Sequence, residues 1–389
     1  MESVKFIFRN NLKQYAMLIA LVVIMGFFQF TTGGILLVPM NVTNLVLQNA
    51  YVFILAIGMT LCIVAGGNID LSVGSLVAFI GAFSGILIVD YKMNTGLGIV
   101  LALVAGLVVG IWQGYWIAFV RIPAFIVTLA GMLIFRGLTI FMLKGLTIGP
   151  FPDAFQKISS GFMPDFLHMP GLNLNIAAIV AGAIVALLYA IAVISRRVMR
   201  RRNGFENSTF PLFLAQVIAV CFTILLIAFW LSKYKGLPII FIIIGVLVYA
   251  YTFFTTRTVP GRYFYAMGGN EKAARLSGIN TNRILFAAYV NMGVLSAIAG
   301  VAFASRLNAA TPTAGQGFEL DAIAACFIGG ASAYGGIGTV IGGIIGALVM
   351  GVLNNGMSIM GVGSDVQQIV KGLVLLAAVA FDVVSKKRA

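Results

Sequence analysis

Long apolar segments follow one another along almost the whole chain, and they limit the folds that it can adopt. A helix crosses the hydrocarbon core of a bilayer with about 20 mostly apolar residues. Segments of about that length lie at residues 16–38, 44–65, 71–90, 97–119, 124–142, 174–194, 211–231, 237–254, 284–304, 318–334, 339–361 and 366–384. The chain is therefore predicted to be an all-α integral membrane protein, a polytopic helical bundle with about 10–12 transmembrane segments. The segment at 318–334 is short and begins with acidic residues, so we expect a re-entrant or broken helix there.

The composition leads to the same fold class. Hydrophobic residues make up 61% of the 389 residues and charged residues only 9%, whereas a soluble domain has roughly 45–50% and about 25%. So few charges do not cover the surface of a soluble fold of this length. A protein in a bilayer does not need a charged surface over its membrane-spanning part, because lipid solvates apolar side chains.

The positive charges indicate an orientation. The formal net charge is +14. When the N-terminus is placed inside and the apolar segments cross the membrane in turn, most of the bases fall on the inside, as the positive-inside rule predicts. The densest basic run is Arg196-Arg197 followed by Arg200-Arg201-Arg202. This pattern predicts that both termini are cytoplasmic and gives no sign of a nucleic-acid-binding face. The first apolar segment is too long for a typical signal peptide and is interpreted as a spanning helix.

No residue pattern points to an enzyme, a metal or a cofactor. The three cysteines lie singly in apolar segments, and the single histidine, His168, lies in a polar linker. The chain has no GxxxxGK[ST] loop, so it is not expected to hydrolyse ATP itself. We expect one transmembrane domain over residues 1–389, with an extracytoplasmic linker at 143–173 and a cytoplasmic loop at 255–283.

A polar stretch, Gly66-Gly67-Asn68-Ile69-Asp70-Leu71-Ser72, separates the second and third apolar segments. Asn68, Asp70 and Ser72 are candidates for a gate or a cavity wall beside a translocation path, because an acid at membrane depth is costly and is seldom without a role. The alternative is a helix N-cap, in which a side-chain oxygen accepts from the first backbone N–H groups of the next helix.

The cytoplasmic loop contains a second distinctive stretch. Asn270 is a favourable N-cap and Gly278 a favourable stop for a short helix, and small residues lie between them. A short helix on the cytoplasmic face with a small-residue centre suits docking into a groove of a partner protein. The alternative is a basic loop attracted to anionic lipid. The candidate docking residues are Gly268, Gly269, Asn270, Glu271, Ala273, Ala274 and Gly278.

Further polar residues lie inside the last apolar segments. Glu319 and Asp321 are expected to face a cavity or to make structural hydrogen bonds. Asn354 and Asn355 either bridge helices or bind a solute hydroxyl, since a buried amide needs partners. A weak internal repeat relates Phe79-Ile80-Gly81, which follows Asp70, to Phe327-Ile328-Gly329, which follows Glu319.

These stretches resemble the permease subunits of bacterial ATP-binding-cassette importers for monosaccharides, the ribose, xylose and multiple-sugar group. The similarity extends over nearly the whole chain, and the length is closer to the xylose and multiple-monosaccharide type than to the shorter ribose type. The motifs that carry it lie at 68–75, 123–129, 261–279, 319–338 and 367–372. The resemblance implies that 268–278 is the loop that couples the permease to its ATPase, although Lys272 replaces an alanine of the family pattern.

The resemblance also implies a function and partners. Two permease copies, as a homodimer, are expected to move a pentose or hexose by alternating access. Cytoplasmic ATPase subunits would drive them, and an extracytoplasmic sugar-binding protein would deliver the solute. The same architecture importing a nucleoside or a branched amino acid stays open, as does, further away, an ion-coupled secondary transporter. An intramembrane enzyme would need a catalytic set of side chains that the sequence does not contain.

Overall fold

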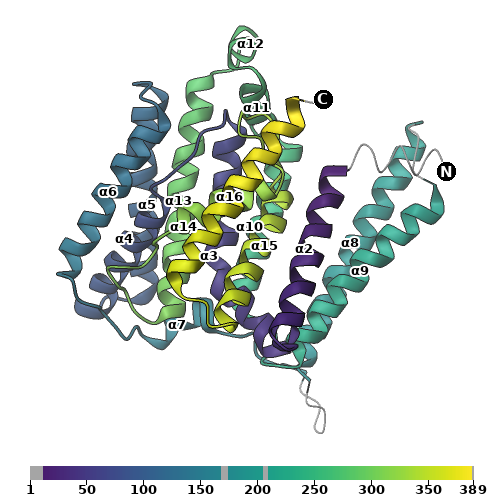
Figure 1. The fold of residues 1–389 in the computed structure, drawn as a ribbon, viewed down its shortest axis with the longest axis horizontal. Coiled ribbons are helices and arrows are strands. Elements are labelled where there is room, and N and C mark those ends of the chain that lie inside the picture. Colours follow the sequence, from purple (N-terminus) through teal and green to yellow (C-terminus); the bar gives the residue numbers. More distant parts are fainter. Residues whose placement is uncertain (1–11, 168–173, 205–208, 388–389) are drawn as a thin grey trace. The chain divides into compact units, whose positions relative to one another are not determined.

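The computed structural model describes residues 12–167, 174–204 and 209–387, and these residues are overwhelmingly helical (Figure 1). The long helices are α2 (Leu12–Thr31), α3 (Pro39–Val64), α5 (Thr95–Ala118), α6 (Ala124–Leu143), α8 (Ile176–Arg202), α9 (Phe210–Ser232), α10 (Ile239–Arg257), α13 (Thr281–Leu307), α15 (Val340–Ile359) and α16 (Ser364–Lys387). The shorter helices are α4 (Val73–Gly85), α7 (Asp153–Ser160), α11 (Val259–Gly269), α12 (Glu271–Leu276) and α14 (Phe318–Ile328). A 3-10 turn lies at Ile35–Leu37, and a π turn at Ile86–Asp90 continues α4.

The predicted fold class is confirmed. Among the described residues, 10 helices are long and apolar enough to cross a membrane. They include Val73–Asp90, which is α4 with its π turn, whereas Met17–Thr31 of α2 forms a shorter apolar helix. The segment expected to be broken contains the 11-residue α14, which ends at Ile328, followed by a non-helical stretch up to Val340.

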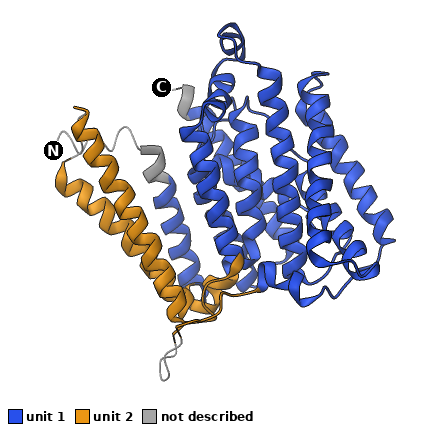
Figure 2. Ribbon diagram, turned by 180° about the vertical axis from the view of Figure 1, so that it is seen from behind, with its two compact units in different colours: residues 1–36, 45–160, 240–389 blue, residues 37–44, 161–239 orange. Residues whose placement is uncertain are grey.

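The chain divides into two compact units, coloured separately in Figure 2. Unit 1 contains residues 1–36, 45–160 and 240–389, and unit 2 contains residues 37–44 and 161–239. The main element of unit 2 is the antiparallel hairpin of α8 and α9. Its two helices approach closely at Gly182, where an added Cβ would lie 2.3 Å from the Cβ of Ala228. Such small residues let membrane helices pack at short range.

Within unit 1, α5 and α13 are the most closely packed pair of helices. A Cβ added to Gly293 would lie 2.4 Å from the carbonyl oxygen of Gly106 and 2.8 Å from the backbone nitrogen of Gly110. The two backbones therefore touch without side chains between them, as expected where dispersion forces rather than the hydrophobic effect hold helices together.

Unit 1 has two ends, named here after the short helices that they carry. The α12 end carries α11 and α12, the loops 65–72, 119–123 and 329–339, and the C-terminal end of α16 (Figure 1). Asp382 near that end of α16 accepts a hydrogen bond from the backbone N–H of Ala333. The α7 end carries α7 and the chain around Ala310, which pairs through its backbone with Ile148. The predicted cytoplasmic loop and the end of α16 thus share one end of the unit.

Two helices, α4 and the short α14, begin inside unit 1 rather than at its ends. Phe318, the first residue of α14, stacks on Tyr51 in the middle of α3, with ring centroids 3.6 Å apart. Just before α4, the Ser72 side chain lies against Gly131, eight residues into α6 and so about 10 Å from its first residue. The two N-termini meet: a Cβ at Gly74 would lie 2.2 Å from the carbonyl oxygen of Gly315.

The α4 and α14 helices run from this meeting point toward opposite ends of unit 1. Asp70 and Glu319 occupy equivalent positions of the weak sequence repeat. Asp70 lies shortly before α4, and Glu319 lies in the first turn of α14. The structure is therefore consistent with an inverted pair of broken helices, an arrangement that many transporters use.

Candidate functional site

The short helix expected in the cytoplasmic loop is α12, which projects from its end of unit 1. Asn270 caps it, since its side-chain oxygen accepts from the backbone N–H of Ala273 at 3.0 Å. Gly278 follows the helix with a φ of +84°, a left-handed conformation that glycine adopts without strain. Ala274 is buried, Ala273 is exposed, and Leu276 is 90% exposed. The helix thus presents the small Ala273 and the apolar Leu276 uncovered, beside the exposed bases Lys272 and Arg275, as a docking element would.

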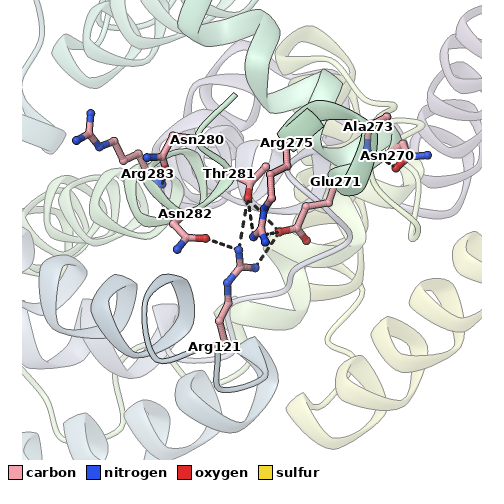
Figure 3. Close-up of polar contacts among 9 residues, drawn as sticks. All are labelled: Arg121, Asn270, Glu271, Ala273, Arg275, Asn280, Thr281, Asn282 and Arg283. Carbon is pink, nitrogen blue, oxygen red and sulfur yellow. Dashed lines mark hydrogen bonds and ion pairs between the residues drawn. The ribbon is translucent and has the colours of Figure 1, made fainter. Parts of the chain in front are cut away.

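A cluster of polar side chains holds the base of α12 in place (Figure 3). The half-buried Glu271 accepts from Arg121 at 2.9 Å and from the Thr281 hydroxyl at 3.1 Å, and pairs more weakly with Arg275 at 3.5 Å. Arg121 comes from the loop between α5 and α6, and it also donates to Asn282. Three separate segments therefore meet at one carboxylate.

The ionisation of Glu271 reflects these neighbours. Burial raises the pKa of Glu271, but the hydrogen bond and charge of Arg121, helped by Thr281 and Arg275, outweigh burial and leave its pKa below that of an ordinary glutamate. Because the pKa of Glu271 is lower in the folded chain than in the unfolded chain, the cluster stabilises the fold at pH values above the usual glutamate pKa. That stabilisation is lost as the pH falls through the lower, folded-state value.

The end of α11 is in direct backbone contact with the end of α3 and with the loop that follows α14. A Cβ at Gly268 would lie 1.8 Å from the carbonyl oxygen of Val64 and 2.5 Å from the backbone nitrogen of Gly336. That nitrogen donates to the same Val64 oxygen at 2.9 Å. The adjacent Gly269 would meet nothing within 4 Å. Gly268 is therefore needed for close packing and Gly269 is not.

A cavity of about 390 Å³ opens beside this contact. Its lining brings together Asn68, Arg121 and Tyr334 with the segment from Gly268 to Glu271. The predicted candidate Asn68 thus lies with the α12 segment rather than with Asp70 and Ser72.

The remaining members of that stretch, Asp70 and Ser72, are buried near the junction of the broken helices. Asp70 accepts from the backbone N–H of Ser72 at 2.8 Å and from its hydroxyl at 2.6 Å. Gln113 of α5 donates to the Ser72 hydroxyl at 2.7 Å. Ser72 makes no side-chain hydrogen bond to the first turn of α4. These contacts favour a role in fixing the re-entrant loop over a helix cap.

The loop before α14 is fixed in a similar way. Arg136 of α6 donates to the carbonyl oxygens of Pro312 at 2.9 Å and Ala314 at 2.6 Å. A Cβ at Gly74 would lie 2.3 Å from a carboxylate oxygen of Glu319. Glu319 therefore lies at the junction of the broken helices, next to the start of α4.

Asp321 lies deeper and is fully buried in a polar cluster. Its carboxylate pairs with Lys371 of α16 at 2.9 Å and accepts from the Tyr51 hydroxyl at 2.8 Å. The side-chain amide of Asn354 contacts Asp321 at 3.5 Å and Asn49 at 3.4 Å. The cluster ties α3, α14, α15 and α16 together.

Asn355 points to a different partner, the side-chain oxygen of Gln48 in α3, at 3.4 Å. The contacts of Asn354 and Asn355 therefore favour the helix-bridging interpretation over contact with a solute. The predicted residues do not form one site: they divide among the α12 segment, the broken-helix junction and the Asp321 cluster, and Asn355 lies with Gln48 outside these groups.

The sequence interpretation missed several residues that complete these groups. Gln113 is a lone amide in an apolar helix, and such a residue needs a partner. Lys371 is a lone base in the last apolar segment, which predicts an acidic partner. Arg121 and Thr281 carried no comparable signal, because loop residues have many possible partners. The described residues hold no group of three or more His, Cys, Asp or Glu arranged for a metal, and His168 lies outside them.

Comparison with known proteins decides the family. Residues 41–379 match the family described as the permease component of the branched-chain amino acid transport system. The chain belongs to this permease family. It is therefore a multi-pass membrane transport protein rather than an enzyme, as the sequence predicted.

Individual relatives are similar over most of their length. The xylose transport system permease protein of Haemophilus influenzae is 40% identical over 378 residues, which cover 97% of this chain and 98% of the relative. The corresponding protein of Escherichia coli K12 is 40% identical over 379 residues, or 97% and 93% of the two chains. The ribose import permease protein of the same strain is 34% identical over 342 residues, or 88% and 85%. No solved structure was found to match the chain.

Proposed function

We propose that the chain is the transmembrane subunit of an ATP-driven importer that moves a monosaccharide across the cytoplasmic membrane by alternating access. The observation that carries the proposal is the exposed helix α12, which is held at its base by Glu271 and is uncovered on its outer face. A pentose is the preferred solute, because the xylose and ribose permeases are the relatives that match most of the chain.

In this proposal the segment from Gly268 to Gly278 docks on a cytoplasmic ATPase subunit. Both termini are then cytoplasmic, and for the C-terminus this agrees with the shared location of α12 and the end of α16. A second copy of the permease completes the path as a homodimer, and an extracytoplasmic sugar-binding protein delivers the solute. The broken-helix junction, with Asp70, Ser72 and Glu319 near the middle of unit 1, is the part best placed to change shape along that path.

Uptake by reconstituted vesicles tests this function. The permease is combined with a candidate ATPase subunit and a candidate sugar-binding protein, and accumulation of labelled xylose and ribose is followed with ATP and without an ion gradient. We expect ATP-dependent uptake of one of these sugars. Uptake that needs an ion gradient and no ATP would contradict the proposal and favour a secondary transporter.

Branched-chain amino acids are a second candidate solute, because the description of the matching family names them. The same vesicles separate the two candidates. Labelled leucine is expected to remain outside, and an excess of unlabelled leucine is expected to leave sugar uptake unchanged.

The docking assignment has its own test, Ala273→Asp. Ala273 is exposed on α12, so the change should leave the permease folded. A carboxylate buried without a partner in an interface costs several kcal/mol, so we expect copurification of the ATPase to fall by at least about tenfold.

Ala154→Asp is the matched control, since Ala154 is an exposed alanine in the first turn of the short helix α7, at the opposite end of unit 1. ATPase recovery should be unchanged in that variant. Equal recovery of the ATPase with both variants would remove α12 from the docking surface.

A further inference from the structure

The cavity beside α12 has the size and the construction of a small-molecule site. Its volume is about 390 Å³, within the range of about 300–1,000 Å³ that is usual for such sites. Its walls all belong to unit 1, and they come from the loop 65–72, the end of α5, the start of α6 with the loop before it, the turn from α11 to α12, the start of α13 and the loop after α14. A hollow built from so many segments is fixed by the tertiary structure. It is called the α12 cavity below.

The lining of the α12 cavity combines polar and apolar groups. The side-chain amide of Asn68 both donates and accepts hydrogen bonds, and the side chain of Tyr334 adds a hydroxyl on an aromatic ring. Ile117, Ile122 and Leu285 contribute aliphatic surface. A monosaccharide carries hydroxyls around its rim and C–H groups on its faces. This mixture of an amide, a phenol and aliphatic side chains is therefore suited to it.

The charges of the lining cancel each other. Among the described residues that line the cavity, only Arg121 and Glu271 are charged, and their side chains pair at 2.9 Å (Figure 3). An anionic ligand would have to draw Arg121 away from the half-buried carboxylate, and breaking such a contact is costly. A zwitterionic amino acid would need to separate both partners. The α12 cavity is therefore suited to a neutral polar molecule.

The α12 cavity lies between two parts that the proposed function requires to move. Asn68 belongs to the loop that leads into α4, and Asp70, two residues further on, binds Ser72 near the broken-helix junction. Across the cavity, Gly269 and Glu271 lie where α11 ends and α12 begins. A molecule that contacts both walls stabilises one arrangement of them, because a ligand favours the conformation that it binds more tightly.

We propose that the α12 cavity binds the free, neutral monosaccharide from the cytoplasm, and that accumulated solute thereby slows the ATP-driven cycle. This inference rests on the proposed function, which places α12 on the cytoplasmic side. It adds a second solute site, separate from the broken-helix junction and from the Asp321 cluster. Import then falls as the solute accumulates inside the cell.

The first test is binding to the purified full-length permease without its partners. Xylose and ribose are titrated by ligand-detected NMR, with free leucine and a pentose phosphate as comparison solutes. We expect one of the neutral sugars to bind, and the two charged solutes to bind much more weakly. Asn68→Leu keeps the size of the side chain but removes its hydrogen bonds, so sugar affinity should fall about tenfold. Asn68→Gln keeps the amide and should stay within about threefold.

Gly269→Leu is a second, independent variant for the same titration. A Cβ at Gly269 meets no atom within 4 Å, so a larger side chain can enter the lining without a clash. We expect weaker sugar binding with an unchanged thermal unfolding midpoint. Equal sugar affinity in the unaltered protein, Asn68→Leu and Gly269→Leu would overturn the assignment. So would the absence of sugar binding, or tighter binding of the pentose phosphate than of the neutral sugar.

ATP hydrolysis by reconstituted vesicles tests the effect on the cycle. A candidate sugar-binding protein and saturating sugar are enclosed in the vesicles, and ATP is added outside, so that only permeases whose ATPase subunit faces outward are driven. Sugar added outside then has access to the α12 cavity. At a concentration equal to its Kd it should lower hydrolysis about twofold, and Asn68→Leu should need about tenfold more sugar for the same effect.

Two contrary results have different meanings. Hydrolysis that is insensitive to external sugar, in a permease whose sugar binding depends on Asn68, would overturn the regulatory role of the α12 cavity. A failure of the proposed function is distinguishable from this, because the unaltered permease would then support no ATP-dependent uptake, whatever the binding titration gives.

Discussion

Replacing Lys371 by methionine is expected to destabilise unit 1 by about 3–5 kcal/mol, because the change leaves the carboxylate of Asp321 buried without its cation. Lys371 and Asp321 are 2.9 Å apart, and the Asp321 side chain is fully buried while that of Lys371 is 17% exposed. The thermal unfolding midpoint of the detergent-solubilised protein is the measurement, and we expect a fall of many degrees.

The double variant Asp321→Asn with Lys371→Met is the control for this prediction. It removes both charges, and the introduced asparagine would keep a polar group for Tyr51 and Asn354. We expect it to recover most of the lost midpoint, since removing a whole buried pair costs far less than removing one partner. A double variant that is no more stable than Lys371→Met would show that the ion pair is not the source of the loss.

The same pair of variants separates structure from transport. If the stable double variant still carries the solute, Asp321 is a structural residue. If it folds but does not transport, Asp321 belongs to the translocation path, one of the two roles that the sequence left open. The contacts favour the first outcome, because Tyr51, Asn354 and Lys371, which bind the Asp321 carboxylate, are all side chains of unit 1.

Gly268→Ala is expected to have the second large effect. The new methyl group would lie 1.8 Å from the carbonyl oxygen of Val64 and 2.5 Å from the backbone nitrogen of Gly336. Backbone atoms cannot move aside as a flexible side chain does, so the hydrogen bond between Val64 and Gly336 must lengthen or break. We expect a loss of about 1–3 kcal/mol in stability, the usual range for overpacking, together with lower ATP-driven uptake.

Gly269→Ala is the matched control, one residue further along the same helix. An added Cβ there would meet nothing within 4 Å, and alanine is a better helix former than glycine. Stability is therefore expected to be unchanged or slightly higher. If both alanine variants are equally stable, close contact at Gly268 does not hold the α12 segment in place.

Much of the fold could be predicted from the sequence because the bilayer imposes a simple length rule. Each apolar segment of about 20 residues predicted a helix, and the structure confirms the fold class. The short segment beginning near Glu319 was correctly expected to be broken, since its acidic residues and its length do not suit a full span. The local signals of α12 were also sufficient: an Asn cap and a Gly stop act within a few residues.

The membership in a permease family likewise followed from motifs along the chain, because residue type and spacing carry that information without coordinates. The division of the predicted polar residues among separate groups could not be predicted from the sequence. Asn68 and Asp70 are two residues apart, yet Asn68 lines the cavity beside α12 and Asp70 binds Ser72 near the broken-helix junction. A sequence does not show how deeply a non-helical loop enters the bundle.

The loop at 255–283 likewise separates what the sequence determines from what the tertiary structure decides. The sequence by itself determined that a short capped helix forms between Asn270 and Gly278, because capping depends on neighbouring residues. Only the tertiary structure decided that Glu271 faces Arg121 and Thr281 and that Gly268 touches the backbone of Val64. Those contacts join residues far apart in the chain, and their partners are selected by the packing of whole helices rather than by any local pattern.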